Sequence, residues 1–150
     1  ASPAEWLFCL DSDVAAPKDT YQRLLSHNLP IISGLYHRRK GPPFNPCMWK
    51  SVPGRRDYTP IEQYPNGVIE ADVIGMGCCL IHRSVFQKVP QPWFLWTHDP
   101  TATEAGLSED FYFCEAARKV GYKIFVDTGI RCLHYGQGVN ENGGFRPSLI

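Results

Sequence analysis

One short segment constrains the fold of this chain more than any other. Residues 6–10, Trp-Leu-Phe-Cys-Leu, form an uninterrupted apolar run that ends abruptly in Asp11-Ser12-Asp13. A short run that is apolar at consecutive positions is typical of a strand buried on both faces. We therefore expect a central strand with neighbours on both sides and two carboxylates at its carboxyl end. On this hypothesis, some of those neighbours lie upstream of the sequence.

The segments that follow predict an α/β fold. Residues 17–27 have helical spacing, and residues 31–36 form a second apolar run. Strand, helix and strand in this order suggest a βαβ unit with a parallel pair of strands. We expect a mixed, largely parallel sheet flanked by helices. A chain of 150 residues is long enough for one domain with a substantial core.

The middle of the chain is irregular. Residues 37–66 contain six prolines, which predicts a long loop with one or two short strands. Such a loop either binds something or is a mobile insertion. Strands are then expected over residues 68–74 and 78–81. Between them, Gly75-Met76-Gly77 either lets the backbone approach a bulky group closely or forms a β-bulge.

The C-terminal third contains the strongest helix signal. Ser108 is placed to cap a helix with a buried stripe, and Gly121 is placed to end it. Residues 83–88 predict a single helical turn. Strands are expected over residues 123–126 and 131–134, separated by a turn at 127–129. The stripe is formed by Phe113, Ala116, Ala117 and Val120.

The composition limits the classes of partner that this protein is expected to bind and the cellular compartment in which it is expected to lie. The 15 basic and 15 acidic residues balance, which argues against nucleic acid or an anionic membrane as the main partner. No apolar run is long enough to span a membrane. The six cysteines contain no CxxC pair, so we expect reduced, mostly buried thiols in a cytoplasmic protein. In an extended segment, Cys78 and Cys79 point to opposite faces.

Asp11 and Asp13 are the first candidates for chemistry. At i and i+2 on an extended segment, both carboxylates lie on one side, where a cation relieves their repulsion. Oxygen ligands of this kind suit Mn²⁺ or Mg²⁺, which bridge carboxylates to substrate phosphates. The alternative is a capped turn before the helix that begins near Pro17.

Four motifs, in order and spacing, give this chain a resemblance to a known family. It resembles the nucleotide-sugar glycosyltransferases of the GT-A fold, especially the inverting family 2 type, over roughly residues 5–136. The resemblance implies two parts, a GT-A catalytic region at residues 1–136, similar to the C-terminal part of that Rossmann-like fold, and a loosely ordered tail at 137–150. The motifs are Trp6 to Asp13, Gly75 to Arg83, Ser108 to Phe111 and Cys132 to His134.

The resemblance implies roles for particular residues. Asp13 is the main metal ligand, Asp11 contacts the donor or the metal, and His134 is the third ligand. Asp110 is the general base, with Glu109 as its rival. Residues 75–83, including Gly75, Met76 and Gly77, line the pocket for the nucleotide-sugar donor and the sugar or glycan acceptor. The implied reaction is a single displacement with inversion.

Each of these residues also has a structural interpretation. Glu109 and Asp110 complement the dipole of the helix they begin, and a lone histidine such as His134 is often structural. The run Arg38-Arg39-Lys40 either holds a diphosphate or an anionic acceptor, or is a solvated charged surface. Trp93 and Trp96 either belong to the core or form a platform on which a sugar stacks.

Members of this family begin with a nucleotide-binding half that has no counterpart in this sequence. We therefore expect a fragment of a longer enzyme, with an exposed apolar sheet edge or face beside residues 6–10. Two other functions remain open. One is a non-catalytic carbohydrate-binding or scaffold protein of the same fold, and the other is a metal-dependent phosphoester hydrolase.

Overall fold

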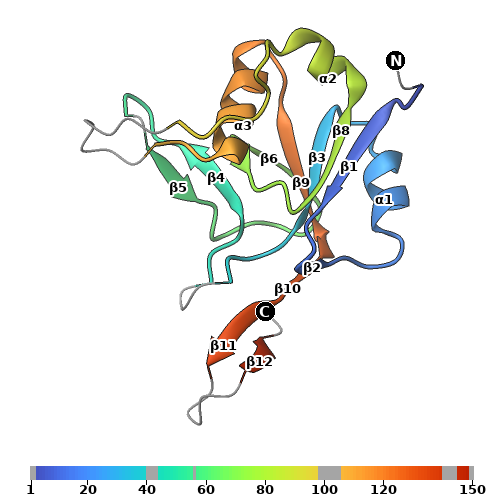
Figure 1. Cartoon of the computed structure of the whole chain (residues 1–150), viewed down its shortest axis with the longest axis vertical. Helices are drawn as coiled ribbons and strands as arrows, with labels where there is room; N and C mark the ends of the chain where they lie inside the picture. Colours follow the sequence, from blue (N-terminus) through green and yellow to red (C-terminus); the bar gives the residue numbers. More distant parts are fainter. Residues whose placement is uncertain (1–2, 40–43, 56, 98–105, 140–144, 149–150) are drawn as a thin grey trace.

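The centre of the molecule is a five-stranded sheet (Figure 1). The computed structural model describes residues 3–39, 44–55, 57–97, 106–139 and 145–148. Along the sheet, the strand order is β1-β8-β3-β9-β6. The strands are β1 (Trp6–Leu10), β3 (Ile31–Leu35), β6 (Val68–Ala71), β8 (Cys78–His82) and β9 (Ile124–Arg131).

The sheet is mixed, which confirms the α/β class, but it is mostly antiparallel. Strands β3 and β9 are parallel, whereas the pairs β1–β8, β8–β3 and β9–β6 are antiparallel. The expected parallel neighbours β1 and β3 run in the same direction, but β8 lies between them. The expectation of a largely parallel sheet was wrong. A strand–helix–strand order indicates that the two strands run in the same direction, but it does not indicate whether a later strand is inserted between them.

Strand β1 lies at an edge of the sheet that the described residues form, whereas a central strand has neighbours on both sides. Within the described residues, β1 pairs with β8 on one side. Leu7 and Leu10 are 45% and 47% exposed. This is an exposed apolar edge beside residues 6–10, of the kind that the sequence analysis expects.

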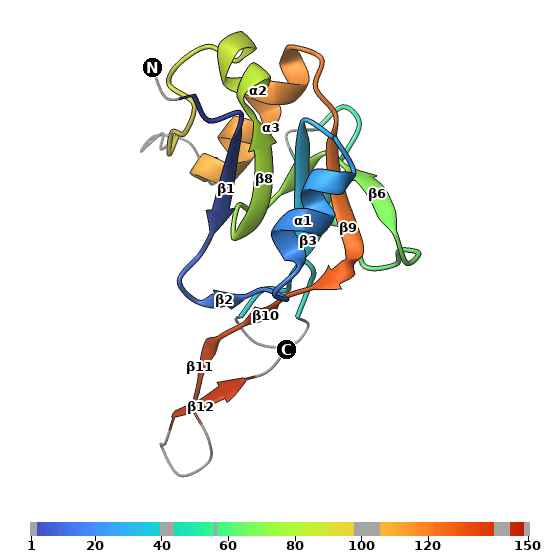
Figure 2. The ribbon, with the colours of Figure 1, turned by 90° about the vertical axis from the view of Figure 1, so that its right-hand side faces the viewer.

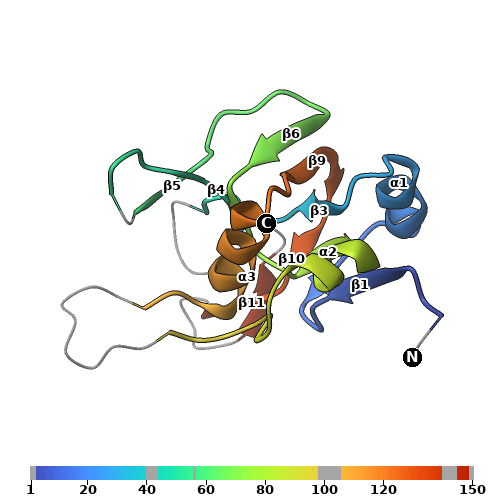
Figure 3. The ribbon, with the colours of Figure 1, turned by 90° about the horizontal axis from the view of Figure 1, so that it is seen from above.

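Helices cover both faces of the sheet. Helix α1 (Thr20–Ser26) packs on one face, and α2 (Arg83–Lys88) and α3 (Glu109–Lys119) pack on the other. Figure 3 shows α1 and α3 on opposite sides of β3. Each face has its own hydrophobic cluster, and Cys78 and Cys79 belong to different clusters, as their alternation predicts. All six cysteines are free thiols.

The proline-rich segment forms a small second sheet. Strands β4 (Met48–Ser51), β5 (Tyr58–Pro60) and β7 (Val73–Ile74) pair in the order β5-β4-β7. The two strands within residues 37–66 confirm the expectation of one or two. Strand β2 (Val14–Ala15) pairs with β10 (Leu133–His134) next to the main sheet.

The predicted turn at residues 127–129 was wrong, because β9 continues through them. The Asp127 carboxylate is buried between the His27 ring, whose Nε2 is 2.9 Å away, and the Gly129 N–H, which donates to Oδ1 at 2.9 Å. Thr128 Oγ1 donates to the Pro65 carbonyl at 2.8 Å. Polar groups that favour a turn in isolation therefore find partners within the sheet.

Beyond residue 136, the described backbone forms a hairpin. Strand β11 (Gly136–Val139) pairs with β12 (Phe145–Ser148), and Figure 2 shows this hairpin projecting away from the main sheet. It falls in the segment expected to be a loosely ordered tail, of which residues 140–144 and 149–150 lie outside the described residues. None of the helices in the described part of the chain has the length and apolar character needed to cross a membrane.

Candidate functional site

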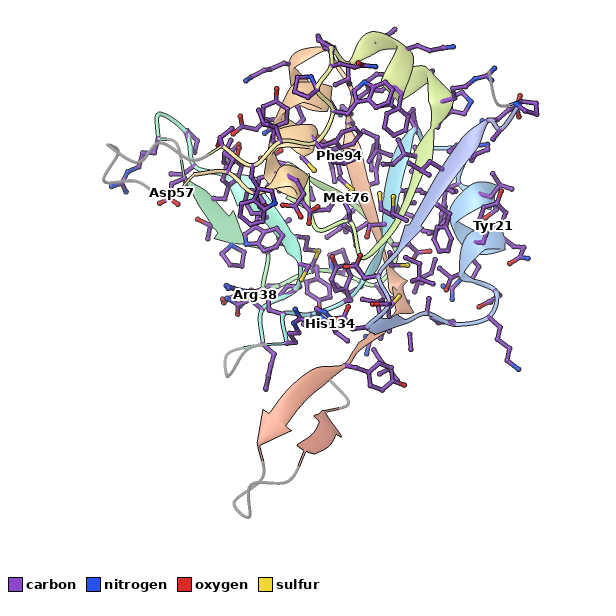
Figure 4. All side chains as sticks on the ribbon, in the orientation of Figure 1. Tyr21, Arg38, Asp57, Met76, Phe94 and His134 are labelled. Carbon is purple, nitrogen blue, oxygen red and sulfur yellow. The ribbon has the colours of Figure 1, made fainter. Side chains whose placement is uncertain are left out.

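A cleft of about 510 Å³ opens where β1 and β3 end and β8 begins. Figure 4 shows the labelled Arg38 and His134 in this region, with Met76 above them. Five of the residues singled out from the sequence for the site line this cleft: Asp11, Asp13, Gly75, Asp110 and His134. Its other lining residues are Tyr36, Arg38, Arg39, Cys47, Trp49, Ser108 and Phe111.

The Gly75-Met76-Gly77 turn connects the parts of the cleft. The Asp11 N–H donates to the Gly77 carbonyl at 3.0 Å, and the Met76 N–H donates to Asp110 Oδ2 at 3.3 Å. The Gly77 N–H donates to the Tyr36 hydroxyl at 2.9 Å. This one turn therefore sets the position of a carboxylate from β1's end relative to a carboxylate from α3.

The two glycines are required by Tyr36. A Cβ atom on Gly75 would overlap the Tyr36 hydroxyl, and one on Gly77 would lie 2.9 Å from the same ring. Of the two sequence-based interpretations, close approach by a bulky group is therefore the one observed, and that group is a side chain of this chain. Met76 itself is buried in the core, and its part in the cleft is its backbone N–H.

Asp13 and His134 are brought together by the short β2–β10 pair. His134 pairs with Val14, and the Tyr135 N–H donates to the Asp13 carbonyl at 2.8 Å. The His134 ring lies between two acceptors, with Nδ1 2.7 Å from the His37 carbonyl and Nε2 3.5 Å from Asp13 Oδ2. Since a carbonyl can only accept, Nδ1 carries a proton, and in the neutral ring the lone pair of Nε2 faces Asp13.

The imidazole nitrogen and the carboxylate oxygen of this pair, 3.5 Å apart, are atoms of the types that bind divalent cations. A histidine whose other nitrogen donates to a backbone carbonyl is the usual arrangement in metal sites. In the described residues, however, no group of three or more His, Cys, Asp or Glu side chains has the arrangement of a metal site. Mg²⁺ and Mn²⁺ commonly take one or two protein carboxylates and complete their shell with water and substrate oxygens, so a two-ligand site still fits.

Arginines supply positive charge beside this pair. Arg39 Nη1 forms an ion pair with Asp13 Oδ2, the same oxygen that faces His134, and Arg38 also lines the cleft. The Arg39 side chain is about half exposed, so water and salt weaken the ion pair, and the guanidinium can move to another anion at low cost. Lys40 lies outside the described residues.

Asp110 has the most perturbed carboxyl group of the cleft. It lies in the first turn of α3, and burial raises its pKa from an ordinary 3.8 to about 6. The hydrogen bond from the Met76 N–H lowers the pKa, whereas Glu109 and Asp11 raise it further. A carboxyl group that titrates close to neutral pH is suited to accept and release a proton.

The neighbours of Asp110 differ from expectation. Ser108 occupies the N-cap position of α3, but its side chain makes no capping hydrogen bond. Glu109, the rival base, is not among the described residues that line the cleft, and its Oε2 is buried without a hydrogen-bond partner in the described part of the chain. Cys47 lines the cleft as a protonated thiol, since burial raises its pKa to about 12.

Trp93 and Trp96 lie elsewhere. Trp93 lines a separate apolar groove of about 300 Å³ with Trp6, Leu7 and Phe86, and its indole donates to the Val89 carbonyl at 3.1 Å. Trp96 is 68% exposed. The aromatic side chains in the cleft are instead Tyr36, Trp49 and Phe111. Phe111 closes one of the motifs that carry the family resemblance, but no role was expected for any of the three.

We predict that Gly75→Ala destabilises the protein by about 1–3 kcal/mol, because the new methyl group displaces Tyr36. Tyr36→Phe removes the overlapping hydroxyl at the cost of leaving the buried Gly77 N–H without its acceptor. In a double-mutant cycle followed by urea unfolding, Gly75→Ala is therefore expected to cost less in the Tyr36→Phe background. Strictly additive costs would contradict the proposed contact.

We also predict that Asp110→Asn stabilises the protein in a pH-dependent way. Because the folded-state pKa of about 6 exceeds the ordinary value, the stability contributed by the protonated carboxyl is complete below about pH 4 and is lost as the pH rises through 6. The advantage of the Asn variant should therefore grow between about pH 4 and 6.5, to at most about 3 kcal/mol.

The matched control is the exposed Asp19→Asn, because water solvates that carboxylate in the folded and unfolded chain alike. Urea unfolding at several pH values measures both differences. An Asp110→Asn advantage that does not change with pH would show that the carboxyl is not desolvated.

Comparisons with known proteins establish the fold and leave the activity open. No family model and no curated protein matches this chain. Among solved structures, it is similar to the crystal structure of A197 from STIV, with a TM-score of 0.60 and 17% sequence identity. The match covers 97% of this chain and 67% of the A197 chain. The likeness shows a shared fold.

Proposed function

We propose that this protein transfers a sugar from a nucleotide-sugar donor to an acceptor hydroxyl, with inversion and with the help of a divalent cation. One observation carries the proposal. Asp11, Asp13, Gly75, Asp110 and His134, which are spread over more than 120 residues of sequence, line a single cleft. The carboxylates and the imidazole among them have the chemistry that the resemblance to inverting GT-A glycosyltransferases requires, and Gly75 contributes backbone to the cleft.

The diphosphate of the donor binds beside Asp13, where a divalent cation and the arginines would supply positive charge. Asp13 and His134 would hold a divalent cation, which offsets the negative charge that develops on the leaving diphosphate. Arg39 exchanges its contact with Asp13 for a phosphate oxygen, and Arg38 lies in the same cleft. Asp11 would contact the cation through water or accept a hydrogen bond from a hydroxyl of the donor.

Asp110 is the general base. Its carboxylate accepts the proton of the acceptor hydroxyl while that oxygen forms a bond to the anomeric carbon. The bond between that carbon and the diphosphate oxygen breaks at the same time, and the nucleoside diphosphate leaves from the opposite side. The anomeric configuration is thereby inverted. Proton transfer to a positioned base contributes about 10²–10⁴-fold to such a rate.

The raised pKa of Asp110 also supports a catalytic role over a purely binding one. A buried carboxyl that accepts one backbone hydrogen bond and has a raised pKa lowers the stability of the fold at neutral pH. A carboxylate that only accepts hydrogen bonds from sugar hydroxyls does not need a raised pKa. A transferase gains a base that is ionised at neutral pH and still basic enough to accept a proton.

The test is an assay of nucleoside diphosphate release from UDP- and GDP-sugars, with Mn²⁺ and a panel of methyl glycosides as acceptors. We predict acceptor-dependent release that falls as the pH drops below about 6, where Asp110 becomes protonated. Asp110→Asn is expected to slow release about 100-fold or more, while the binding of UDP or GDP with Mn²⁺ stays unchanged.

Asp19→Asn, which alters an exposed carboxylate on the other side of the sheet, is the matched control and should retain full activity. Release that is equally fast without an acceptor would identify a hydrolase instead. Sugar binding with no release at all would identify a binding protein. Full activity of Asp110→Asn would contradict the assignment of the base.

A further inference from the structure

An aromatic wall lies beside Asp110 in the cleft. We use this name for Trp49 and Phe111, whose ring centroids are 4.9 Å apart. Trp49 belongs to β4, the middle strand of the three-stranded sheet, and Phe111 belongs to the first turn of α3. The wall is therefore built from regular elements, which hold its position before any ligand binds.

A second layer supports the wall. The Tyr58 ring packs against Phe111 with centroids 5.1 Å apart, and its hydroxyl donates a hydrogen bond to Glu115, one turn further along α3. Both Trp49 and Phe111 are only partly buried, although they pack against the core. Aromatic surface that is fixed in place and left accessible within a polar cleft is suited to contact a ligand.

Two hydrogen-bond donors in the cleft form no hydrogen bond with another residue that the structure describes. The Ser108 hydroxyl makes no capping bond, although Ser108 occupies the N-cap position of α3. The Trp49 indole N–H likewise forms no hydrogen bond with any described residue, and it is not among the buried unsatisfied atoms. Both groups are therefore available to hydroxyl groups of a ligand that rests on the wall.

These groups match the chemistry of a sugar ring. A pyranose has an apolar C–H face, which packs on an aromatic ring, and a rim of hydroxyls, which need donors and acceptors. We propose that the aromatic wall is the subsite for the sugar ring of the acceptor, with Trp49 as the side chain on which the ring stacks. The assignment of the bound sugar as the acceptor rests on the proposed function, whereas the proposal of a sugar-binding subsite does not.

Charge favours the acceptor over the donor nucleotide at this place. Arg39 and His134, which suit phosphates, contact Asp13, whereas the wall is uncharged and its Phe111 follows Asp110 in sequence. Because the wall and Asp110 line the same cleft, we expect the hydroxyls of a ring seated on the wall to face the proposed base. The dianionic diphosphate is attracted to the arginines, which leaves the wall for the neutral ligand.

The experiment compares the binding of a panel of methyl hexopyranosides by saturation-transfer difference NMR, which needs no turnover. The protein variants are wild type, Trp49→Ala, Trp49→Phe and the control Trp96→Ala, which alters an exposed indole outside the cleft. We expect binding of at least one glycoside that weakens about tenfold in Trp49→Ala. Trp49→Phe should retain most of the affinity, and Trp96→Ala all of it.

A kinetic readout separates this inference from the proposed function. In the transfer assay, Trp49→Ala should raise the acceptor KM about tenfold and leave the donor KM unchanged. Glycoside binding that depends on Trp49 in a protein without transferase activity would overturn the proposed function and support the subsite. Transfer with an unchanged acceptor KM in Trp49→Ala would overturn the subsite alone.

Two further results would also overturn the subsite. One is that no glycoside in the panel binds to the wild-type protein. The other is that Trp49→Ala weakens the binding of UDP or GDP and leaves glycoside binding intact, which would make the wall a nucleobase platform. Circular dichroism of each variant checks the fold. If Trp49→Ala unfolds, Trp49→Leu, which keeps an apolar side chain but removes the ring, takes its place with the same expected loss of glycoside affinity.

Discussion

The candidate site depends on the close approach of Tyr36 to the backbone of Gly75 and Gly77. Because neither glycine has a Cβ, the tyrosine ring fits against the turn, and its hydroxyl accepts the Gly77 N–H. The turn is then positioned to bond Asp11 through its backbone and Asp110 through its carboxylate. A single steric fit thus links the end of β1, the end of β3, the start of β8 and the start of α3.

The cleft built on this turn separates two kinds of chemistry. Around Asp13, the imidazole of His134 and the guanidinium of Arg39 converge on one carboxylate oxygen, an arrangement suited to a cation and phosphates. Around Asp110, burial raises the pKa of the carboxyl group, and the aromatic rings of Trp49 and Phe111 line the cleft in place of charged side chains. An inverting displacement benefits from this division, because the neutral nucleophile approaches the carbon from the side opposite to the one from which the anionic leaving group departs.

Local patterns in the sequence predicted elements better than their arrangement. The α/β class, the three helices and the opposite facing of Cys78 and Cys79 follow from apolar periodicity, which is a local property. The strand β3 was expected beside β1. This prediction was wrong because β8, which pairs with β1, comes almost 70 residues later in the chain. The turn expected at 127–129 failed for a similar reason, because His27 and Pro65, distant in sequence, supply the partners of Asp127 and Thr128.

The site could be predicted in part. The DxD motif stands out by residue type and spacing, the resemblance adds the acid pair and His134, and the structure brings four of these five side chains to one cleft. Tyr36, Trp49 and Phe111 could not be assigned a role in this way, since an aromatic residue is as common in a core as in a site. For the same reason, Trp93 and Trp96 were interpreted either as core residues or as a sugar platform, and neither lines the cleft.

In the proposed reaction, the cleft holds a divalent cation and a diphosphate together. A titration of the chain with Mn²⁺, followed by electron paramagnetic resonance with and without UDP or GDP, tests this directly. We predict Mn²⁺ binding that one nucleoside diphosphate strengthens, that Asp13→Ala removes and that Asp19→Ala leaves intact. Absence of binding in the wild-type chain, or equal binding by Asp13→Ala, would contradict it.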